Sequence, residues 1–224
     1  EKNKNLEKNP SNSNQNPGEG QNWTVFAMDT VMQFDAYGGS AALQEKVKRR
    51  VEELEGELST TQENSDIFYL NQEKTAKLSD DTRYLMQEAL ALGAETDGAL
   101  DISIYPVVQS WGFTTGNYRV PSESERESLL KSVDYRLVGL EADTASIEPG
   151  MMVDLGGVGK GFTGDEVVKT MKEDGVTSAL FSLGGNIQTI GTKPDGEKWY
   201  VGIKDPESDG YLGGVGVQDE AVIT

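Results

Sequence analysis

The sequence predicts an α+β fold in which a layered, mixed β-sheet is flanked by helices. Two observations support this class. Segments with period-2 alternation follow one another across short turns, as they do in β-hairpins. Segments with a helical apolar period lie between these hairpins. In a parallel sheet each strand is followed by one helix, and this strict alternation is absent here.

The first predicted strand spans residues 23–37, in which Met32, Phe34 and Ala36 alternate with polar side chains. A helix is expected next, with Ser40 as its candidate N-cap. Helical spacing gives this segment a single apolar face, which consists of Leu43, Val47, Val51, Leu54 and Leu58.

Capping residues mark two further helices. Ser79 is a candidate N-cap for a helix that reaches about residue 93, and Ser122 and Glu125 have the spacing of a capping box. The remaining predicted elements are strands at 135–140 and 145–148, a helix at 159–174, and strands at 179–183, 187–190 and 199–203.

The first 22 residues differ from the rest in composition. They are rich in Asn, Glu, Lys, Gly and Pro, and Leu6 is their single large apolar side chain. Such a segment buries too little surface to offset the entropy lost on ordering. We therefore expect a disordered tether at 1–22 and a folded domain at 23–224.

The charge of the chain restricts its ligands. With 38 acidic and 20 basic side chains, the formal net charge is −18. An anionic surface repels phosphate backbones and anionic lipid headgroups, which argues against binding to nucleic acid or to a membrane surface. An anionic ligand would need a local lysine, backbone N–H groups or a metal ion.

Two residue types are missing altogether. The sequence has no cysteine and no histidine. This excludes disulfides, thiolate zinc sites, cysteine nucleophiles and Ser-His-Asp triads within these 224 residues. A metal bound here would need oxygen ligands, which favours Mg²⁺ or Ca²⁺. No segment approaches the ~18 consecutive apolar residues of a membrane span.

The strongest local signal is the glycine-rich segment 153–162. An apolar strand enters it, and a helix with Lys160 in its first turn is expected to leave it. Unpaired amides at a helix start and an ammonium group would suit a diphosphate. A Walker A loop is excluded because Gly161 stands where Ser or Thr is needed, and the glycine spacing does not match the dinucleotide fingerprint. A turn required only for packing is the alternative.

Three weaker segments each have a simple structural explanation. In 98–106, Asp101 could cap a helix, and Trp111 and Phe113 beyond it could be core or could line a pocket for a planar ring. The paired glycines within 182–186 suggest a β-turn or bulge. Met28, on the first predicted strand, is by default a core filler.

The order of these segments is more informative than any one of them. Met-Asp-Thr-x-Met at 28–32, Ser-Asp-Ile-x-x-Leu-Asn at 65–71, Gly-Ala-Leu-Asp at 98–101, Asp-Leu-Gly-Gly-x-x-Lys-Gly at 154–161 and Gly-Gly-Asn-Ile at 184–187 follow one another. This succession resembles the ApbE family of FAD:protein FMN transferases over residues 23–224. The resemblance implies a T-fold-related α+β domain.

The resemblance also implies which residues form the site, because each motif matches a functional motif of the family. It implies FAD contacts for Met28, Ala99, Leu100, Asp101, Asp154 and Lys160. It implies a backbone oxygen ligand to Mg²⁺ at Gly157. The sequence departs from the family at Asp29, where the family usually has Gly, and at Thr61, where it often has a Tyr near the flavin.

The activity that the resemblance implies is Mg²⁺-dependent transfer of FMN from FAD to a Thr or Ser hydroxyl of a target flavoprotein, with release of AMP. Two alternatives stay open: hydrolysis of FAD to FMN and AMP, and FAD binding without catalysis. The family domain continues beyond the segment that corresponds to Ala221–Thr224 into a His-containing loop and a metal site. We therefore expect these 224 residues to be inactive, or nearly so, on their own.

The composition of the predicted tether also suggests a location. An Asn-rich segment of this kind resembles the spacer that follows the lipid-modified cysteine of exported bacterial lipoproteins. We therefore expect an extracytoplasmic protein that is tethered by a lipid to the outer face of the bacterial cell membrane.

Overall fold

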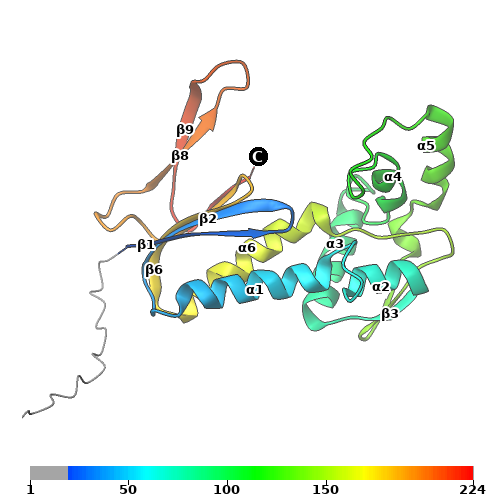
Figure 1. Ribbon diagram of the computed structural model, residues 1–224, viewed down its shortest axis with the longest axis horizontal. Coiled ribbons are helices and arrows are strands. Elements are labelled where there is room, and N and C mark those ends of the chain that lie inside the picture. Colours follow the sequence, from blue (N-terminus) through cyan, green and yellow to red (C-terminus); the bar gives the residue numbers. More distant parts are fainter. Residues whose placement is uncertain (1–19, 224) are drawn as a thin grey trace, which may run out of the picture.

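The computed structural model describes residues 20–223, and these residues form the predicted α+β fold (Figure 1). The main sheet has the strand order β1-β2-β6-β7-β10, and all of its neighbouring strands are antiparallel. Its strands are β1 (Gly20–Ala27), β2 (Thr30–Gly38), β6 (Val176–Leu183), β7 (Asn186–Ile190) and β10 (Ala221–Val222).

The single strand predicted at 23–37 was wrong, because this segment is a hairpin. β1 and β2 pair with each other from Gly20 opposite Tyr37 to Ala27 opposite Thr30. Two residues connect them, Met28 with φ of 50° and Asp29 with φ of 55°. Positive φ at both central positions is typical of the type I′ hairpin turn, which usually contains Asn or Gly. Neither is present; Asp29 tolerates such a conformation, but Met28 is unusual in it, so the sequence gives only a weak sign of the turn.

The boundary of the predicted tether also needs correction. Residues 1–19 of that segment lie outside the described residues, but Gly20–Asn22 already belong to β1. Their side chains are polar or absent, so hydropathy does not mark the start of the strand. Pairing with β2 extends the folded domain to Gly20.

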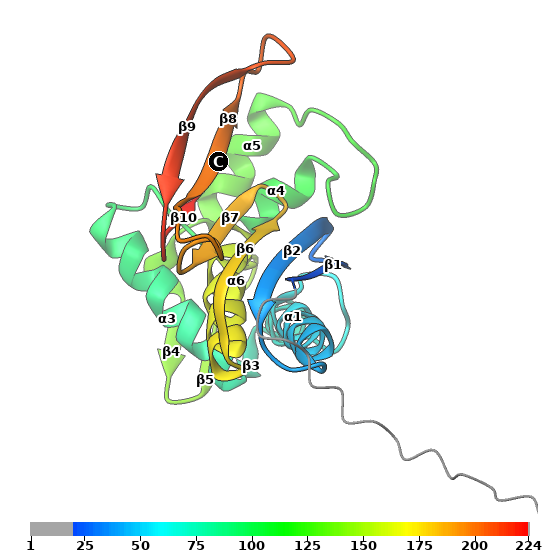
Figure 2. The same cartoon turned by 90° about the vertical axis from the view of Figure 1, so that its left-hand side faces the viewer.

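Two long helices, α1 (Leu43–Leu58) and α6 (Gly156–Glu173), pack against each other and against one face of the main sheet (Figure 2). The predicted apolar face of α1 is confirmed, since all of its members are buried. The core beneath the sheet contains stacked rings, with Phe34 5.0 Å from Trp23 and 5.6 Å from Phe181 between ring centroids.

A second core lies beyond the sheet, and α1 and α6 extend into it. Leu54 and Leu58 of α1 pack there against α2 (Asp66–Glu73) and α3 (Asp80–Glu95), and Phe162 of α6 packs at its edge. A small antiparallel sheet closes this core with the order β3-β5-β4. Its strands are β3 (Thr75–Lys77), β4 (Gly139–Glu141) and β5 (Thr144–Ser146). The two helices therefore connect the main sheet to this second layer.

The strands predicted at 135–140 and 145–148 are correspondingly displaced. Tyr135–Leu137 forms a short 3₁₀ turn, and the strands begin and end closer to the intervening turn. A second 3₁₀ turn spans Leu130–Ser132, directly after α5 (Glu123–Leu129), and α4 (Tyr105–Ser110) precedes them.

The predicted helix caps have different outcomes. Ser79 accepts from Thr82 N at 3.3 Å and Ser122 accepts from Glu125 N at 3.2 Å, as expected. Ser40 does not cap α1, whose N-cap position is Ala42. The Ser40 hydroxyl instead donates to Asp174 at 2.9 Å and thereby ties the start of α1 to the end of α6.

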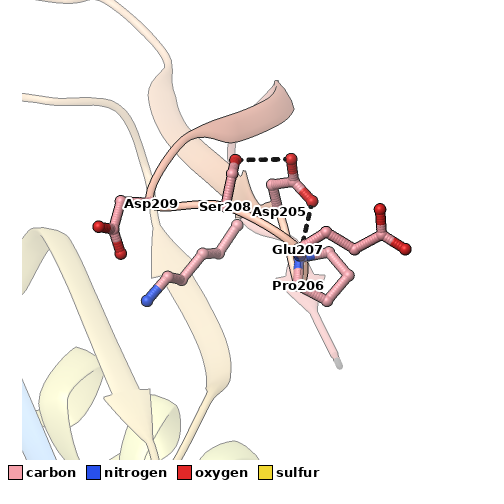
Figure 3. Close-up of a pocket in the computed structure, with 6 residues that line it drawn as sticks. Asp205, Pro206, Glu207, Ser208 and Asp209 are labelled. Carbon is pink, nitrogen blue, oxygen red and sulfur yellow. Dashed lines mark hydrogen bonds between the residues drawn. The ribbon is translucent and has the colours of Figure 1, made fainter.

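A hairpin of β8 (Trp199–Lys204) and β9 (Tyr211–Val217) projects away from the body of the protein (Figure 1). A hollow at its tip is lined by residues 204–209 alone (Figure 3). Asp205 accepts hydrogen bonds there from Glu207 N at 2.9 Å and from Ser208 Oγ at 2.7 Å. These bonds close the turn itself, so the hollow is a feature of the turn and not a candidate site. No helix in residues 20–223 has the length and hydropathy of a membrane span.

Burial of Glu57 on α1 has a consequence for stability that can be measured. Burial raises the pKa of the Glu57 carboxyl, and the neighbouring Asp81 and Asp66 charges raise it further, although Ser79 Oγ donates to it at 2.9 Å. A raised pKa in the folded state stabilises the protein at acidic pH, and this contribution is lost as the pH rises through that pKa.

We therefore expect Glu57→Gln to raise the urea midpoint of unfolding at pH 7. The gain should shrink below about pH 4, near the ordinary pKa of a glutamate, because the wild-type carboxyl is protonated there. The glutamine can still accept from Ser79. Equal midpoints of the two proteins at pH 7 would contradict this account of Glu57.

Candidate functional site

Two hairpin turns that are far apart in the sequence meet at one end of the main sheet. The β1–β2 turn carries Met28 and Asp29, and the β6–β7 turn carries Gly184. Gly184 N donates to Val31 O at 3.3 Å, and Gly184 has φ of 61°. A Cβ at this position would lie 2.2 Å from Thr30 Oγ1. Glycine is therefore needed both for the backbone conformation and for the close approach of the two turns.

Both long helices hold Met28. Its backbone N–H donates to Glu55 Oε1 of α1 at 2.7 Å, and the hydroxyl of Thr163 of α6 donates to its sulfur at 3.5 Å. The half-buried side chain packs against both cores. Met28 is thus a packing residue, as the default interpretation predicts, but it also occupies the exposed end of the sheet beside α6.

The glycine-rich segment is helical, which corrects the predicted start of α6 at residue 159. The helix begins at Gly156, because Asp154 Oδ1 accepts from Gly156 N at 2.7 Å and Leu155 O accepts from Val158 N at 3.0 Å. Most of the amides that the sequence predicts to be unpaired are therefore used. The amide of Gly157 has no hydrogen-bond partner in the part of the chain that the structure describes.

Lys160 lies one helical turn before Thr163, on the same face of α6. Its side chain is half-buried, and within residues 20–223 no carboxylate forms an ion pair with it. The start of a helix also carries a partial positive charge. Lys160 and the Gly157 amide are therefore the donors available to an anion at this position.

The segment 99–101 is brought to the start of α6 by backbone pairing. Asp154 N donates to Ile102 O at 2.8 Å, and Ile104 forms a parallel bridge with Met152. A Cβ at Gly157 would lie 3.9 Å from Leu100 Cδ1. Leu100 therefore lies beside the first turn of the helix, and Ala99 next to it is exposed.

Asp101 supports its own loop with both carboxylate oxygens. Oδ1 accepts from Ser103 N at 2.8 Å and from Ser103 Oγ at 2.6 Å, while Oδ2 accepts from Tyr135 N at 3.0 Å. This is close to the capping role considered from the sequence. Oδ1 already accepts two hydrogen bonds, but Oδ2 accepts only one and can accept another from a ligand hydroxyl or N–H.

Asn71 supports the site from α2, although its sequence neighbourhood gives it no obvious role. Its Nδ2 donates to Val153 O at 2.8 Å and its Oδ1 accepts from Val153 N at 2.7 Å, and the side chain is 3% exposed. It thereby fixes the backbone directly before Asp154. Lys74 adds a bond from Nζ to Met151 O at 3.0 Å, and burial lowers the pKa of this lysine. The available signal was a polar residue on the buried face of α2.

Magnesium is not accounted for by the described residues. Residues 20–223 contain no group of three or more acidic side chains arranged to hold a metal ion. Gly157 lies in the first turn of α6, so its carbonyl points along the helix as in any α-helix. A single backbone oxygen is not a sufficient ligand set for Mg²⁺.

The aromatic residues that follow α4 are not ordinary core. Trp111 and Phe113 stack with their centroids 6.2 Å apart, and Tyr118 lies 6.1 Å from Phe113. Phe113 is 58% exposed. The cluster is therefore a surface feature of the loop between α4 and α5.

Fold and site together define an α+β protein in which two hairpin turns, the loop at 99–101 and a glycine-rich helix start converge. The model of one protein family, described as the ApbE family, matches residues 28–224. The chain belongs to the ApbE family.

Relatives and solved structures agree with this membership. The chain is 29% identical over 176 residues to the FAD:protein FMN transferase of Vibrio cholerae serotype O1, covering 76% of this chain and 53% of that protein. It is 27% identical over 198 residues to the Escherichia coli K12 protein of the same name, covering 84% and 56%. The chain thus spans just over half the length of these relatives.

The ApbE protein of Thermotoga maritima superposes with a TM-score of 0.85 at 25% identity, over 91% of this chain and 69% of that structure. The flavin transferase ApbE of Vibrio cholerae superposes with a TM-score of 0.83 at 26% identity, over 92% and 71%. These superpositions confirm the predicted fold class.

Proposed function

We propose that this protein is an FAD:protein FMN transferase. The observation that carries the proposal is that three of the resembling segments meet at the start of α6, where Leu100 lies beside Gly157 and Asn71 holds the backbone before Asp154. Lys160 lies there without an ion-pair partner among the described residues. The turns that carry Met28 and Gly184 belong to the hairpins that meet beside this place, and Met28 contacts Thr163 one turn beyond Lys160. Relatives named FAD:protein FMN transferase match most of this chain. A flavin transferase needs FAD and a protein that accepts the flavin.

The chemistry of the side chains suggests how FAD would be oriented. Lys160 and the Gly157 amide are donors, so they suit the diphosphate of FAD. The carboxyl oxygens of Asp101 and Asp154 accept hydrogen bonds, so they suit hydroxyl or ring N–H groups. Met28 and Leu100 offer apolar contact surface, and Ala99 leaves room beside it. In a chain of net charge −18, the local positive potential at α6 would decide where the diphosphate binds.

The proposed reaction is a displacement at phosphorus. The oxygen of a Thr or Ser hydroxyl of the target protein forms a bond to the FMN phosphorus, and the bond from this phosphorus to the bridging oxygen breaks. AMP leaves with that oxygen, and the hydroxyl proton passes to solvent. An enzyme lowers the barrier of such a step by holding the two reactants in line and by placing hydrogen-bond donors where negative charge develops. We propose that the rate of transfer depends on Mg²⁺.

The test is incubation of the full-length protein with FAD, Mg²⁺ and an FMN-binding target domain, followed by a denaturing gel; residues 1–224 alone are expected to give little or no transfer. The proposal expects flavin fluorescence in the band of the target and release of AMP, and loss of both when EDTA is added. Fluorescence confined to free FMN would favour hydrolysis instead. Bound but intact FAD would favour a binding domain without catalysis, and either result would overturn the proposal.

We also propose an extracytoplasmic location with a lipid anchor, supported by the composition of residues 1–22. Mass spectrometry of the protein isolated from its native cells tests this. A lipid-modified cysteine upstream of the Asn-rich segment is expected. A cytosolic protein without such a modification would contradict it.

A further inference from the structure

The turn that carries Met28 is strained. Met28 and Asp29 both adopt left-handed backbone conformations, with φ of 50° and 55°. Such conformations are unfavourable for residues other than Gly, and least so for Asn and Asp. Strained residues of this kind persist where surrounding contacts hold them, and they concentrate at functional sites.

A carboxylate holds this turn from outside the hairpin. The N–H of the first turn residue has no partner in the ladder of a two-residue hairpin, because Ala27 and Thr30 form the closing pair. In this protein the Met28 N–H donates to Glu55 Oε1 at 2.7 Å, across 27 residues of sequence. The hairpin does not require this bond. It connects the turn to α1.

Glu55 differs from its acidic neighbours on the same helix. Glu52 lies 3.8 Å from Lys48, and Glu53 lies 3.7 Å from Arg49, both on the solvent side. Glu55 forms no ion pair within residues 20–223, and its carboxylate is directed to a backbone amide instead.

We propose that Glu55 is a positioning residue of the flavin site, which acts by fixing the strained turn so that Met28 lies over α6. The Thr163 hydroxyl holds the sulfur of Met28 on the other side. This inference rests on the proposed function, because it assumes that FAD binds beside Met28. It assigns to Glu55 a role in FAD affinity without contact between Glu55 and the nucleotide.

Two substitutions separate the reach of the side chain from its charge. Glu55→Gln retains both the length and an acceptor oxygen, so FAD affinity should stay within about twofold of wild type. Glu55→Asp retains the charge but withdraws the carboxylate by one methylene, so affinity should fall about tenfold. Affinity is measured by quenching of FAD fluorescence. Glu52→Ala removes a charge from the same helix and is expected to leave affinity unchanged.

A double-mutant cycle shows whether the effect passes through Met28. In a Met28→Ala background, Glu55→Asp should have no further effect on FAD affinity, whereas an independent structural role would still lower it. The proposal is wrong if the Glu55→Asp protein binds FAD as tightly as the wild type. It is also wrong if the Glu55→Gln protein loses FAD affinity and the Glu55→Asp protein does not. If the wild-type protein does not bind FAD at all, the proposed function fails instead, which distinguishes the two failures.

Discussion

Replacing Asn71 by leucine is expected to lower the free energy of unfolding by about 2–6 kcal/mol. The two side chains have similar volumes, but leucine leaves the N–H and the C=O of Val153 buried without partners. Each unsatisfied buried group costs about 1–3 kcal/mol. Urea unfolding followed by circular dichroism measures the change. FAD affinity of the folded variant should fall as well, because Asp154 directly follows the released backbone.

The neighbouring residue on α2 provides the control. Gln72 is exposed, so Gln72→Leu should change the free energy of unfolding by less than about 0.5 kcal/mol. Asn71→Asp keeps an acceptor for Val153 N–H but has no donor for Val153 O, and it is expected to be destabilising too. If Asn71→Leu is as stable as the wild type, the two hydrogen bonds do not support the site as described.

Replacing Lys160 by alanine is expected to weaken FAD binding by about tenfold to a hundredfold, which corresponds to roughly 1.4–2.8 kcal/mol. The expected cause is loss of the one ammonium group at the start of α6, in a protein whose overall charge repels the nucleotide. Stability should change little, since Lys160 forms no ion pair in the described part of the chain. Fluorescence titration with FAD measures the affinity.

Lys169 is a matched control on the same helix. Its side chain is 62% exposed and lies 3.7 Å from Glu166, two to three turns beyond Lys160. Lys169→Ala removes the same charge and should leave FAD affinity within about twofold. Equal losses for the two variants would show that net charge, and not a local contact, determines the affinity. Lys160→Arg should retain most of the binding, because the positive charge stays at the helix start.

Much of the fold could be predicted from the sequence because local patterns coincide with tertiary burial. The apolar face of α1 and the serine caps of α3 and α5 are examples, since each follows from spacing over a few residues. The β1–β2 turn could not be predicted. Met28 is not a typical turn residue, and contacts from α1 and the adjacent turn hold the conformation of the hairpin end.

Only part of the candidate site could be predicted, because some of its contacts join residues that are far apart in the sequence. The glycines around Lys160 correctly marked a close approach of chain segments, but they indicated a loop where the structure has a helix start with most amides in use. The role of Asn71 could not be predicted, because its partner Val153 lies 82 residues away in the sequence. Distant pairs of this kind become visible only in the folded structure.

A crystal structure of the protein with FAD is the most direct measurement of where the nucleotide binds. We expect a diphosphate oxygen within hydrogen-bonding distance of Lys160 Nζ and Gly157 N, with the isoalloxazine ring near Met28. A diphosphate bound elsewhere on the protein, with the start of α6 exposed to solvent, would contradict it.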